Sequence, residues 1–183
     1  EVTFSADYLL PRKAFRLVRI EPVKDIRTLT LEFPTPPGDL HYESKPADLL
    51  GFIIGHEGKG SLLSYLKEMG LATALGAYGF DPGRQYGSFF IRIQLTPKGL
   101  KQYRDVVSHV FSYIQVLKDA AYPSALFREQ VIMAKLEELY SDKGEGTGRA
   151  TSLANNLRLY PLEIAERIPY LWTREEPDVY RKF

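Results

Sequence analysis

The alternation of apolar and polar positions predicts four β-strands in the first half of the chain. Residues 88–96, "SFFIRIQLT", show this pattern most clearly, because apolar side chains recur there at every second position. The buried face of this strand would hold Phe89, Ile91, Ile93 and Leu95, and its opposite face Arg92 and Gln94. The same period of two is present in residues 26–33, "IRTLTLEF". We also predict strands at 15–22 and 71–80, with residues 23–25 forming a hairpin between the first two strands.

Two shorter helices are predicted on either side of a glycine-rich stretch. Residues 47–54 are apolar with helical spacing, and three glycines between positions 55 and 60 then interrupt the pattern. Residues 61–70, "SLLSYLKEMG", resume it, with Ser61 as the N-cap and Gly70 at the C-terminal cap. The chain is therefore expected to leave one helix, turn sharply and enter another.

Two long helices are predicted in the second half of the chain. The first begins at Thr96 as N-cap, with Pro97 in its first turn. Its buried stripe is expected to consist of Leu100, Tyr103, Val107, Val110, Phe111, Ile114 and Leu117. The second runs over residues 124–140, with buried Phe127, Val131, Ala134 and Leu139. Residues 141–149 are expected to form a flexible glycine loop, and shorter helices to begin at Pro161 and near Pro177.

The order of these elements predicts an α+β domain. Neighbouring strands are joined by short links, so the sheet is expected to be largely antiparallel, and the helices come in blocks that would cover one face. Residues 1–13 are expected to be a linker or arm, and residues 14–183 a single domain.

Composition and charge narrow the classes of protein. The chain has 183 residues, of which 44% are hydrophobic and 26% charged, as in a globular protein with a single core. The net charge of +1 argues against nucleic acid as a partner, and equally against an electrostatic hold on a membrane surface. The chain has no cysteine, which excludes disulfides, thiolate metal sites and cysteine nucleophiles. We find no apolar stretch long enough to span a bilayer.

The stretch "GHEGKG" (55–60) resembles two catalytic motifs and satisfies neither. A zincin helix needs a second histidine four residues after His56, and that position is Gly60. The inverted order, H-x-x-E-H, is absent too, because Lys59 stands where its glutamate belongs. A phosphate loop would need glycine at position 53, which is Ile53. We therefore assign no catalytic or metal-binding residue in this chain, and a purely architectural junction between two helices remains an alternative explanation of the glycines.

Several separate blocks of the chain are similar, in the right order, to the second homologous domain of the insulinase (pitrilysin) family of zinc metallopeptidases. These blocks are "RIEPVKDIRTLTLEFPTP", "LLGFIIGHEGKGSLLSYLKEMGLATAL", "GSFFIRIQLTPKGLKQYRDVVSHVFSYIQVLK" and "LANNLRLYPLE". In that family the zinc ligands lie in the first domain, upstream of anything present here. The resemblance implies a non-catalytic second domain, ending before a last strand, in an enzyme whose zinc is held outside this chain. Its partners would be a peptide substrate and the catalytic and C-terminal domains of the same enzyme.

The resemblance also implies a candidate substrate site. In insulin-degrading members of the family, the second domain grips the N-terminal end of the substrate away from the zinc. The matching positions here are Gly51, Gly55, Glu57, Leu75, Gly76, Ala77 and Tyr78. The chain departs from those members at Asp48 and Phe52, which replace histidines, and at Ala77 and Tyr78, which replace glycines. The function expected is a chamber-forming domain of a peptide-degrading zinc endopeptidase. The alternative is a domain of a structural or assembly subunit that kept the fold without proteolysis.

Overall fold

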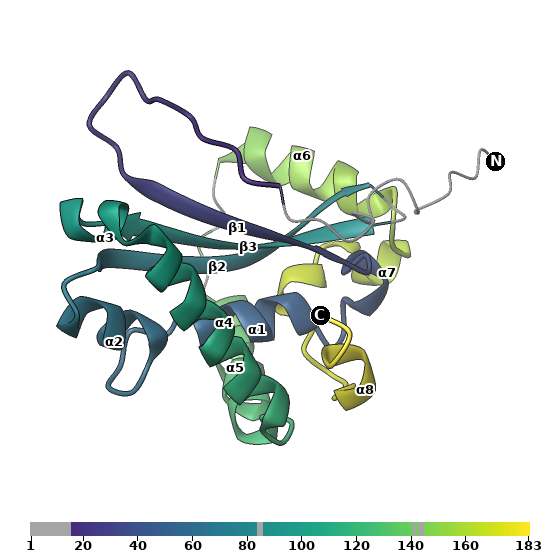
Figure 1. Cartoon of the computed structure of the whole chain (residues 1–183). Coiled ribbons are helices and arrows are strands. Elements are labelled where there is room, and N and C mark those ends of the chain that lie inside the picture. Colours follow the sequence, from purple (N-terminus) through teal and green to yellow (C-terminus); the bar gives the residue numbers. More distant parts are fainter. Residues whose placement is uncertain (1–15, 84–85, 141, 143–144) are drawn as a thin grey trace.

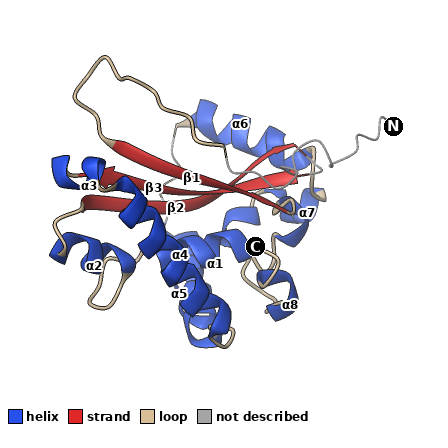
Figure 2. Cartoon of the chain, viewed as in Figure 1, coloured by secondary structure: helices blue, strands red, loops and turns tan. Residues whose placement is uncertain are grey.

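A three-stranded antiparallel sheet forms the centre of the computed structural model, which describes residues 16–83, 86–140, 142 and 145–183 (Figure 1). The strands are β1 (Thr28–Thr35), β2 (Ala72–Gly83) and β3 (Tyr86–Leu95), in the order β1-β3-β2. Helices account for most of the remaining chain (Figure 2). The predicted α+β class with an antiparallel sheet is therefore confirmed.

The central strand β3 has the alternation that its sequence predicts. Phe89, Ile91, Ile93 and Leu95 are all buried. Leu29 of β1 and Leu75 of β2 both lie opposite Ile93, so the three strands present apolar side chains to the same face. Because side chains alternate along a strand, this register leaves the polar residues of β3, such as Arg92, on the other face.

The helical elements follow a simple order along the chain. They are η2 (Asp39–His41), α1 (Pro46–Ile54), α2 (Leu62–Glu68), α3 (Pro97–Lys101), α4 (Tyr103–Asp119), α5 (Ser124–Tyr140), α6 (Gly146–Leu157), α7 (Leu162–Ala165), η3 (Ile168–Tyr170) and α8 (Pro177–Tyr180). Figure 1 draws α1, α2, α4 and α5 below the sheet and α6 above it. No residue of α6 is buried, so this helix adds little to the core among the described residues.

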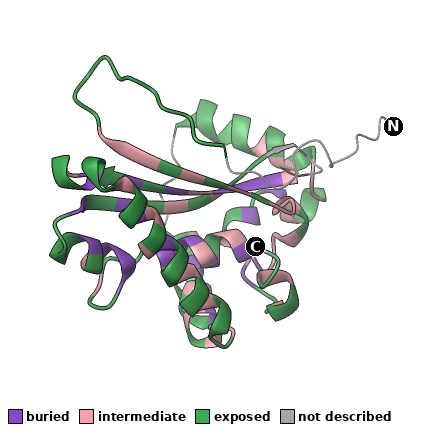
Figure 3. Ribbon diagram, viewed as in Figure 1, coloured by how far each residue is buried: buried purple, intermediate pink, exposed green. Residues whose placement is uncertain are grey.

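Two hydrophobic clusters hold these layers together. The larger one joins the sheet to α2 and α4 and contains Leu63, Leu66, Ile91, Val106 and Val110. The smaller one joins α1 to α5 and the C-terminal segment through Leu49, Phe127, Ala134 and Trp172. Figure 3 shows the buried residues concentrated along the sheet and on the helix sides that face it. Helix α1 contributes to both clusters, through Ile54 and Leu49, and is therefore held firmly in place.

The predicted first strand is wrong. Residues 16–22 have no regular secondary structure, and the segment is exposed throughout, with Ile20 81% exposed. The predicted hairpin at 23–25 is absent with it, since β1 pairs only with β3 among the described residues. Local apolar content was misleading because the apolar side chains of this segment, such as Leu17, Val18 and Ile20, stay exposed in the described structure. Residues 1–13, the predicted linker, lie outside the described residues.

The predicted long helix from Thr96 is interrupted. Helix α3 ends at Lys101, and Gln102 leaves the helical conformation with φ −106° and ψ 30° before α4 begins. The break shifts the helical phase, so Val106 becomes buried while Leu100 is 50% exposed. The predicted stripe was therefore only partly correct.

The glycine-rich segment after α5 is also more ordered than predicted. Helix α6 begins at Gly146, inside the predicted loop 141–149, while positions 141, 143 and 144 lie outside the described residues. The second long helix, residues 124–140, is confirmed as α5, although its Leu139 is 76% exposed. The short helices predicted at Pro161 and Pro177 are present as α7 and α8.

Candidate functional site

Helix α1 lies close to strand β2, and Gly51 makes this approach possible. A Cβ atom at Gly51 would lie 2.7 Å from the carbonyl oxygen of Ala77. A Cβ atom at Gly55, one helical turn later, would lie 3.7 Å from the amide nitrogen of Ala77. Contacts under 3.0 Å force a shift, so any side chain at Gly51 would push the helix away from the strand. The predicted helix–glycine pattern thus fixes the spacing of the two elements that form the site.

An open pocket of about 630 Å³ lies between α1 and β2, and we call it the α1–β2 pocket. Its lining residues are Asp48, Gly51, Phe52, Gly55, His56, Glu57, Gly58, Gly76, Ala77 and Tyr78. Six of the seven residues selected from the sequence are among them. The seventh, Leu75, is 7% exposed and belongs to the sheet core. The position along the strand explains this difference, because Leu75 is covered by the core cluster, whereas Ala77, on the same face of β2, lies beside Gly51 of α1.

Two carboxylates lie at this pocket in very different surroundings. Glu57 follows the end of α1, is 68% exposed and has Lys67 Nζ 3.8 Å away. Asp48 lies in the first turn of α1, where burial raises the pKa of its carboxyl group and the nearby charge of Lys45 partly opposes that rise. A positively charged ligand would offset the cost of burying the Asp48 carboxylate. At Glu57 it would compete only with the weak, exposed ion pair to Lys67.

Four lining residues were not selected from the sequence: Asp48, Phe52, His56 and Gly58. Asp48 and Phe52 stood out only as departures from related domains. The helical spacing of Asp48, Phe52 and Gly55 was the available signal, since residues three or four apart share one face of a helix. The rings of Phe52 and His56 lie 6.2 Å apart, centroid to centroid, and form one wall of the pocket.

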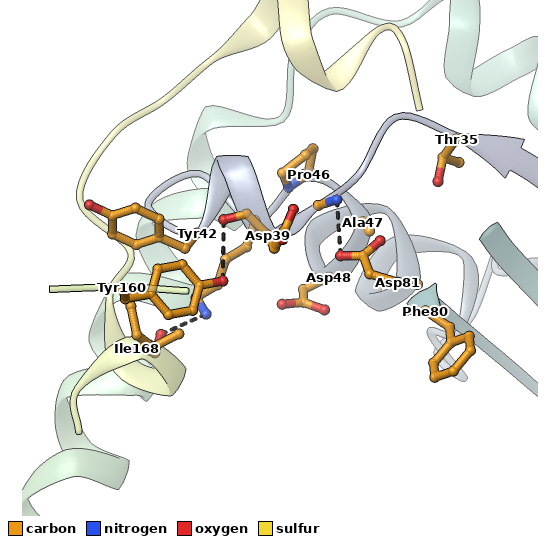
Figure 4. A pocket seen from close by; sticks show the side chains of 13 residues that line it. Thr35, Asp39, Tyr42, Pro46, Ala47, Asp48, Phe80, Asp81, Tyr160 and Ile168 are labelled. Atoms are coloured by element: carbon orange, nitrogen blue, oxygen red, sulfur yellow. Dashed lines mark hydrogen bonds between the residues drawn. The ribbon is translucent and has the colours of Figure 1, made fainter. Parts of the chain in front are cut away.

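A second pocket, of about 190 Å³, adjoins the first, and we call it the three-aspartate pocket (Figure 4). Its lining residues are Thr35, Gly38, Asp39, Tyr42, Lys45, Pro46, Ala47, Asp48, Gly79, Phe80, Asp81, Tyr160 and Ile168. They come from segments far apart in the sequence, which is why no sequence motif pointed to this pocket. Asp48 lines both pockets and connects them.

The three histidines lie in different surroundings. His41 Nδ1 lies 3.3 Å from Glu176 Oε2, His56 lies beside Phe52, and the ring of His109 meets that of Tyr65 at 5.1 Å. Within the residues that the structure describes, no group of three side chains could hold a metal ion. These residues do not fit a zinc site. In the same part of the chain, none of the helices has the length and apolar character needed to cross a membrane.

The fold and the two pockets define an α+β domain with an open pocket between helix α1 and strand β2. The same fold is found in the crystal structure of pitrilysin, with a TM-score of 0.82 at 23% identity, covering 87% of this chain and 17% of that one. The chain belongs to the family of the peptidase M16 inactive domain, whose pattern matches residues 6–133. The predicted resemblance to the insulinase (pitrilysin) family is therefore confirmed.

Named relatives support the same assignment. The A-factor-processing enzyme of Saccharomyces cerevisiae is 32% identical over 185 residues, covering 100% of this chain and 18% of the relative. The human insulin-degrading enzyme is 36% identical over 164 residues, covering 90% of this chain and 16% of the relative. The inactive peptidase domain of a putative zinc protease from Bordetella parapertussis has a TM-score of 0.53 at 16% identity, covering 82% of this chain and 87% of that one. This chain thus spans less than a fifth of the length of the two enzymes.

Proposed function

We propose that this chain is a non-catalytic domain of a zinc metalloendopeptidase that degrades peptides, and that it forms part of the wall of the substrate chamber. The zinc ligands would lie in another domain of the same protein. The observation that carries the proposal is the convergence of Gly51, Gly55, Glu57, Gly76, Ala77 and Tyr78 on one pocket. The membership in a family of inactive peptidase domains and the names of the relatives support it.

The α1–β2 pocket is suited to hold the N-terminal end of a peptide. Strand β2 lies at the edge of the described sheet, and such an edge accepts a peptide backbone through main-chain hydrogen bonds. No atom of the described residues, apart from the chain neighbours of Gly76, lies within 4 Å of the position of a Cβ at Gly76, so a peptide backbone could approach the strand there. Tyr78, 47% exposed and stacked on Phe90 at 5.5 Å, forms the wall at the far end of this approach. Leu75 would act from the core, by fixing the strand.

Glu57 is the proposed partner of the terminal ammonium group. Its exposed pairing with Lys67 is of a kind that contributes only about 0–1 kcal/mol, so an incoming ammonium group can displace it. Hydrogen bonds between charged groups are stronger than neutral ones and would favour a free amino terminus. A peptide without this charge would keep only the contacts of its backbone and side chains.

The Glu57→Gln variant of the full-length protein tests this function. We expect it to weaken the binding of free-amino peptides about ten-fold, the loss of one charge-assisted hydrogen bond, and that of N-acetylated peptides less than about two-fold. Fluorescence anisotropy with a chelator present, so that peptides stay intact, measures both affinities. Glu68→Gln, which removes one charge from an exposed position at the end of α2, is the matched control and should change neither affinity. An equal loss for both kinds of peptide would assign Glu57 a structural role.

The alternative of a non-proteolytic assembly subunit predicts a different full-length protein. The proposed function requires an H-x-x-E-H motif in another part of that protein and peptide hydrolysis that a chelator abolishes. A full-length protein with a degraded motif and no hydrolysis would favour the assembly subunit.

A further inference from the structure

The three-aspartate pocket combines aromatic walls with acidic groups. The rings of Tyr42 and Tyr160 meet edge to face at 5.1 Å, and Phe80 of β2, 56% exposed, lies at the rim of the pocket. Three aspartates and one lysine line the pocket, so its side chains carry an acidic excess when ionised. Figure 4 shows the aspartates and the tyrosine rings around a common space. Its 190 Å³ is the volume of about six water molecules in the liquid, enough for one long side chain.

Among the described residues that line this pocket, Lys45 is the one cation for three aspartates, and its charge acts mainly on Asp48. Lys45 Nζ donates a hydrogen bond to the carbonyl oxygen of Ile168, 2.9 Å away, and does not neutralise an aspartate by direct contact. The Asp81 carboxylate accepts backbone hydrogen bonds from Gly38, at 3.0 Å, and from Asp39, and both donors are neutral amides (Figure 4). Asp39 Oδ1 is buried and has no hydrogen-bond partner within the described part of the chain. A buried acceptor without a donor is costly, so this atom is a place where a ligand's N–H group would be stabilising.

The pocket lies next to the proposed peptide site along the same strand. Gly76, Ala77 and Tyr78 line the α1–β2 pocket, and the next three residues, Gly79 to Asp81, line the three-aspartate pocket. Three residues of a strand span roughly 10 Å. An extended peptide that enters one pocket therefore reaches the other within a few residues.

We propose that the three-aspartate pocket is a subsite for an arginine side chain of a peptide whose N-terminal end occupies the α1–β2 pocket. The inference rests on the proposed function of that neighbouring pocket. Arginine fits because its planar guanidinium group carries five N–H donors and stacks on aromatic rings. Partly buried carboxylates beside tyrosine rings would thus select arginine. The three-aspartate pocket would favour peptides with an arginine close to the amino terminus.

The electrostatics of the aspartates agree with a cationic occupant. Burial raises the pKa of the Asp81 carboxyl group, although the hydrogen bond from the Gly38 amide opposes that rise. Burial likewise raises the pKa of Asp48. A bound guanidinium group would lower both pKa values again, because an opposite charge favours the ionised carboxylate.

The test uses the full-length protein, with a chelator present, and short peptides that carry arginine at the second to fifth positions in turn. For each one, a matched peptide carries citrulline, which has nearly the same shape without the charge. We expect arginine to bind about ten-fold more tightly than citrulline at one of these positions. In Asp81→Asn and in Asp39→Asn this preference should fall to about two-fold, while the affinity for the citrulline peptide stays unchanged. Glu68→Gln should retain the full preference.

The outcomes separate this inference from the proposed function. An N-acetylated copy of each peptide reports on the α1–β2 pocket alone. If acetylation weakens binding but arginine and citrulline bind equally at every position, the arginine subsite is wrong and the proposed peptide site stands. If acetylation has no effect either, the proposed function fails as well. A preference for arginine that survives in both aspartate variants would also overturn the subsite. An unchanged affinity for the citrulline peptide shows that those variants are folded.

Discussion

Gly51 shows how a single residue can serve both packing and the site. Because glycine has no side chain, the carbonyl oxygen of Ala77 can pack directly against the backbone of Gly51. A Cβ atom at Gly51 would lie only 2.7 Å from that oxygen. The same residue is buried and lines the α1–β2 pocket. The width of the pocket therefore depends on the contact that this glycine permits.

We predict that Gly51→Ala destabilises the domain. The added methyl group meets backbone rather than a flexible side chain, and such overpacking typically costs about 1–3 kcal/mol. Urea unfolding followed by circular dichroism measures the loss. Gly146→Ala is the matched control, because a Cβ atom there has no neighbour within 4 Å among the described residues, and it should be neutral or slightly stabilising. Equal stability of Gly51→Ala and the unmodified chain would show that α1 moves freely relative to β2.

The sequence predicted individual residues well where a resemblance or a strand pattern covered them. It placed Gly51, Gly55 and Glu57 at one pocket, and it placed Ile91 and Ile93 in the core. It missed the three-aspartate pocket, because residues such as Asp39, Asp81 and Tyr160 become neighbours only through the fold. Sites assembled from distant segments carry no local spacing that a sequence pattern could reveal.

At the scale of elements, caps and breaks decide where helices lie. Thr96 caps α3 by accepting the Gly99 amide at 2.9 Å, and its hydroxyl also donates to the carbonyl oxygen of Gly70 at 2.7 Å. It thus connects the end of α2 to the start of α3. The cap was predictable from Thr96-Pro97, whereas the break at Gln102 was not, since no glycine or proline marks it.

We predict that Thr96→Ala destabilises the domain by about 1–2 kcal/mol, the usual loss for an N-cap. The effect has two parts, because both the Gly99 amide and the Gly70 carbonyl lose their partner. Thermal unfolding measures it, and Thr96→Ser, which keeps the hydroxyl, should retain most of the stability. Equal losses in the two variants would assign the effect to the methyl group instead of the cap.

At the scale of the whole molecule, the C-terminal segment closes the domain around α1. Glu176 accepts a hydrogen bond from Ser44 Oγ at 2.6 Å and lies 3.3 Å from His41 Nδ1. Trp172 packs on Phe127 at 5.6 Å in the smaller cluster. These contacts position the loop that carries one side of the three-aspartate pocket.

We predict that Glu176 contributes to stability in a pH-dependent way. Hydrogen bonds from Arg174, Ser44 and His41 lower the pKa of its carboxyl group from 4.5 to about 2. Because the pKa is lower in the folded state, the contribution is fully present above about pH 4.5 and is lost as the pH falls toward 2. Between about pH 4.5 and 2, the free energy of unfolding of Glu176→Gln should therefore fall less than that of the unmodified chain, as measured by urea titrations. Glu163→Gln, at an exposed position, is the control and should follow the unmodified chain. If the plots of unfolding free energy against pH for Glu176→Gln and the unmodified chain are parallel, Glu176 does not contribute in this pH-dependent way.

We further predict that this chain holds no stoichiometric zinc. The described histidines lie in separate surroundings, and a tight site requires three or four converging ligands. Equilibrium dialysis of the 183-residue chain against zinc, with circular dichroism as the check of folding, should give far less than one ion per chain. One tightly bound ion per folded chain would contradict this prediction.

The central claim is that the amino-terminal end of a peptide lies between α1 and β2. A peptide with a photoreactive phenylalanine at its first position, bound to the full-length protein with a chelator present, tests this claim most directly. We predict that mass spectrometry will find the cross-link within residues 46–58 or 72–83, the segments of α1 with its following turn and of β2. Excess unlabelled free-amino peptide should abolish the cross-link. A cross-link confined to any other part of the protein would contradict the account.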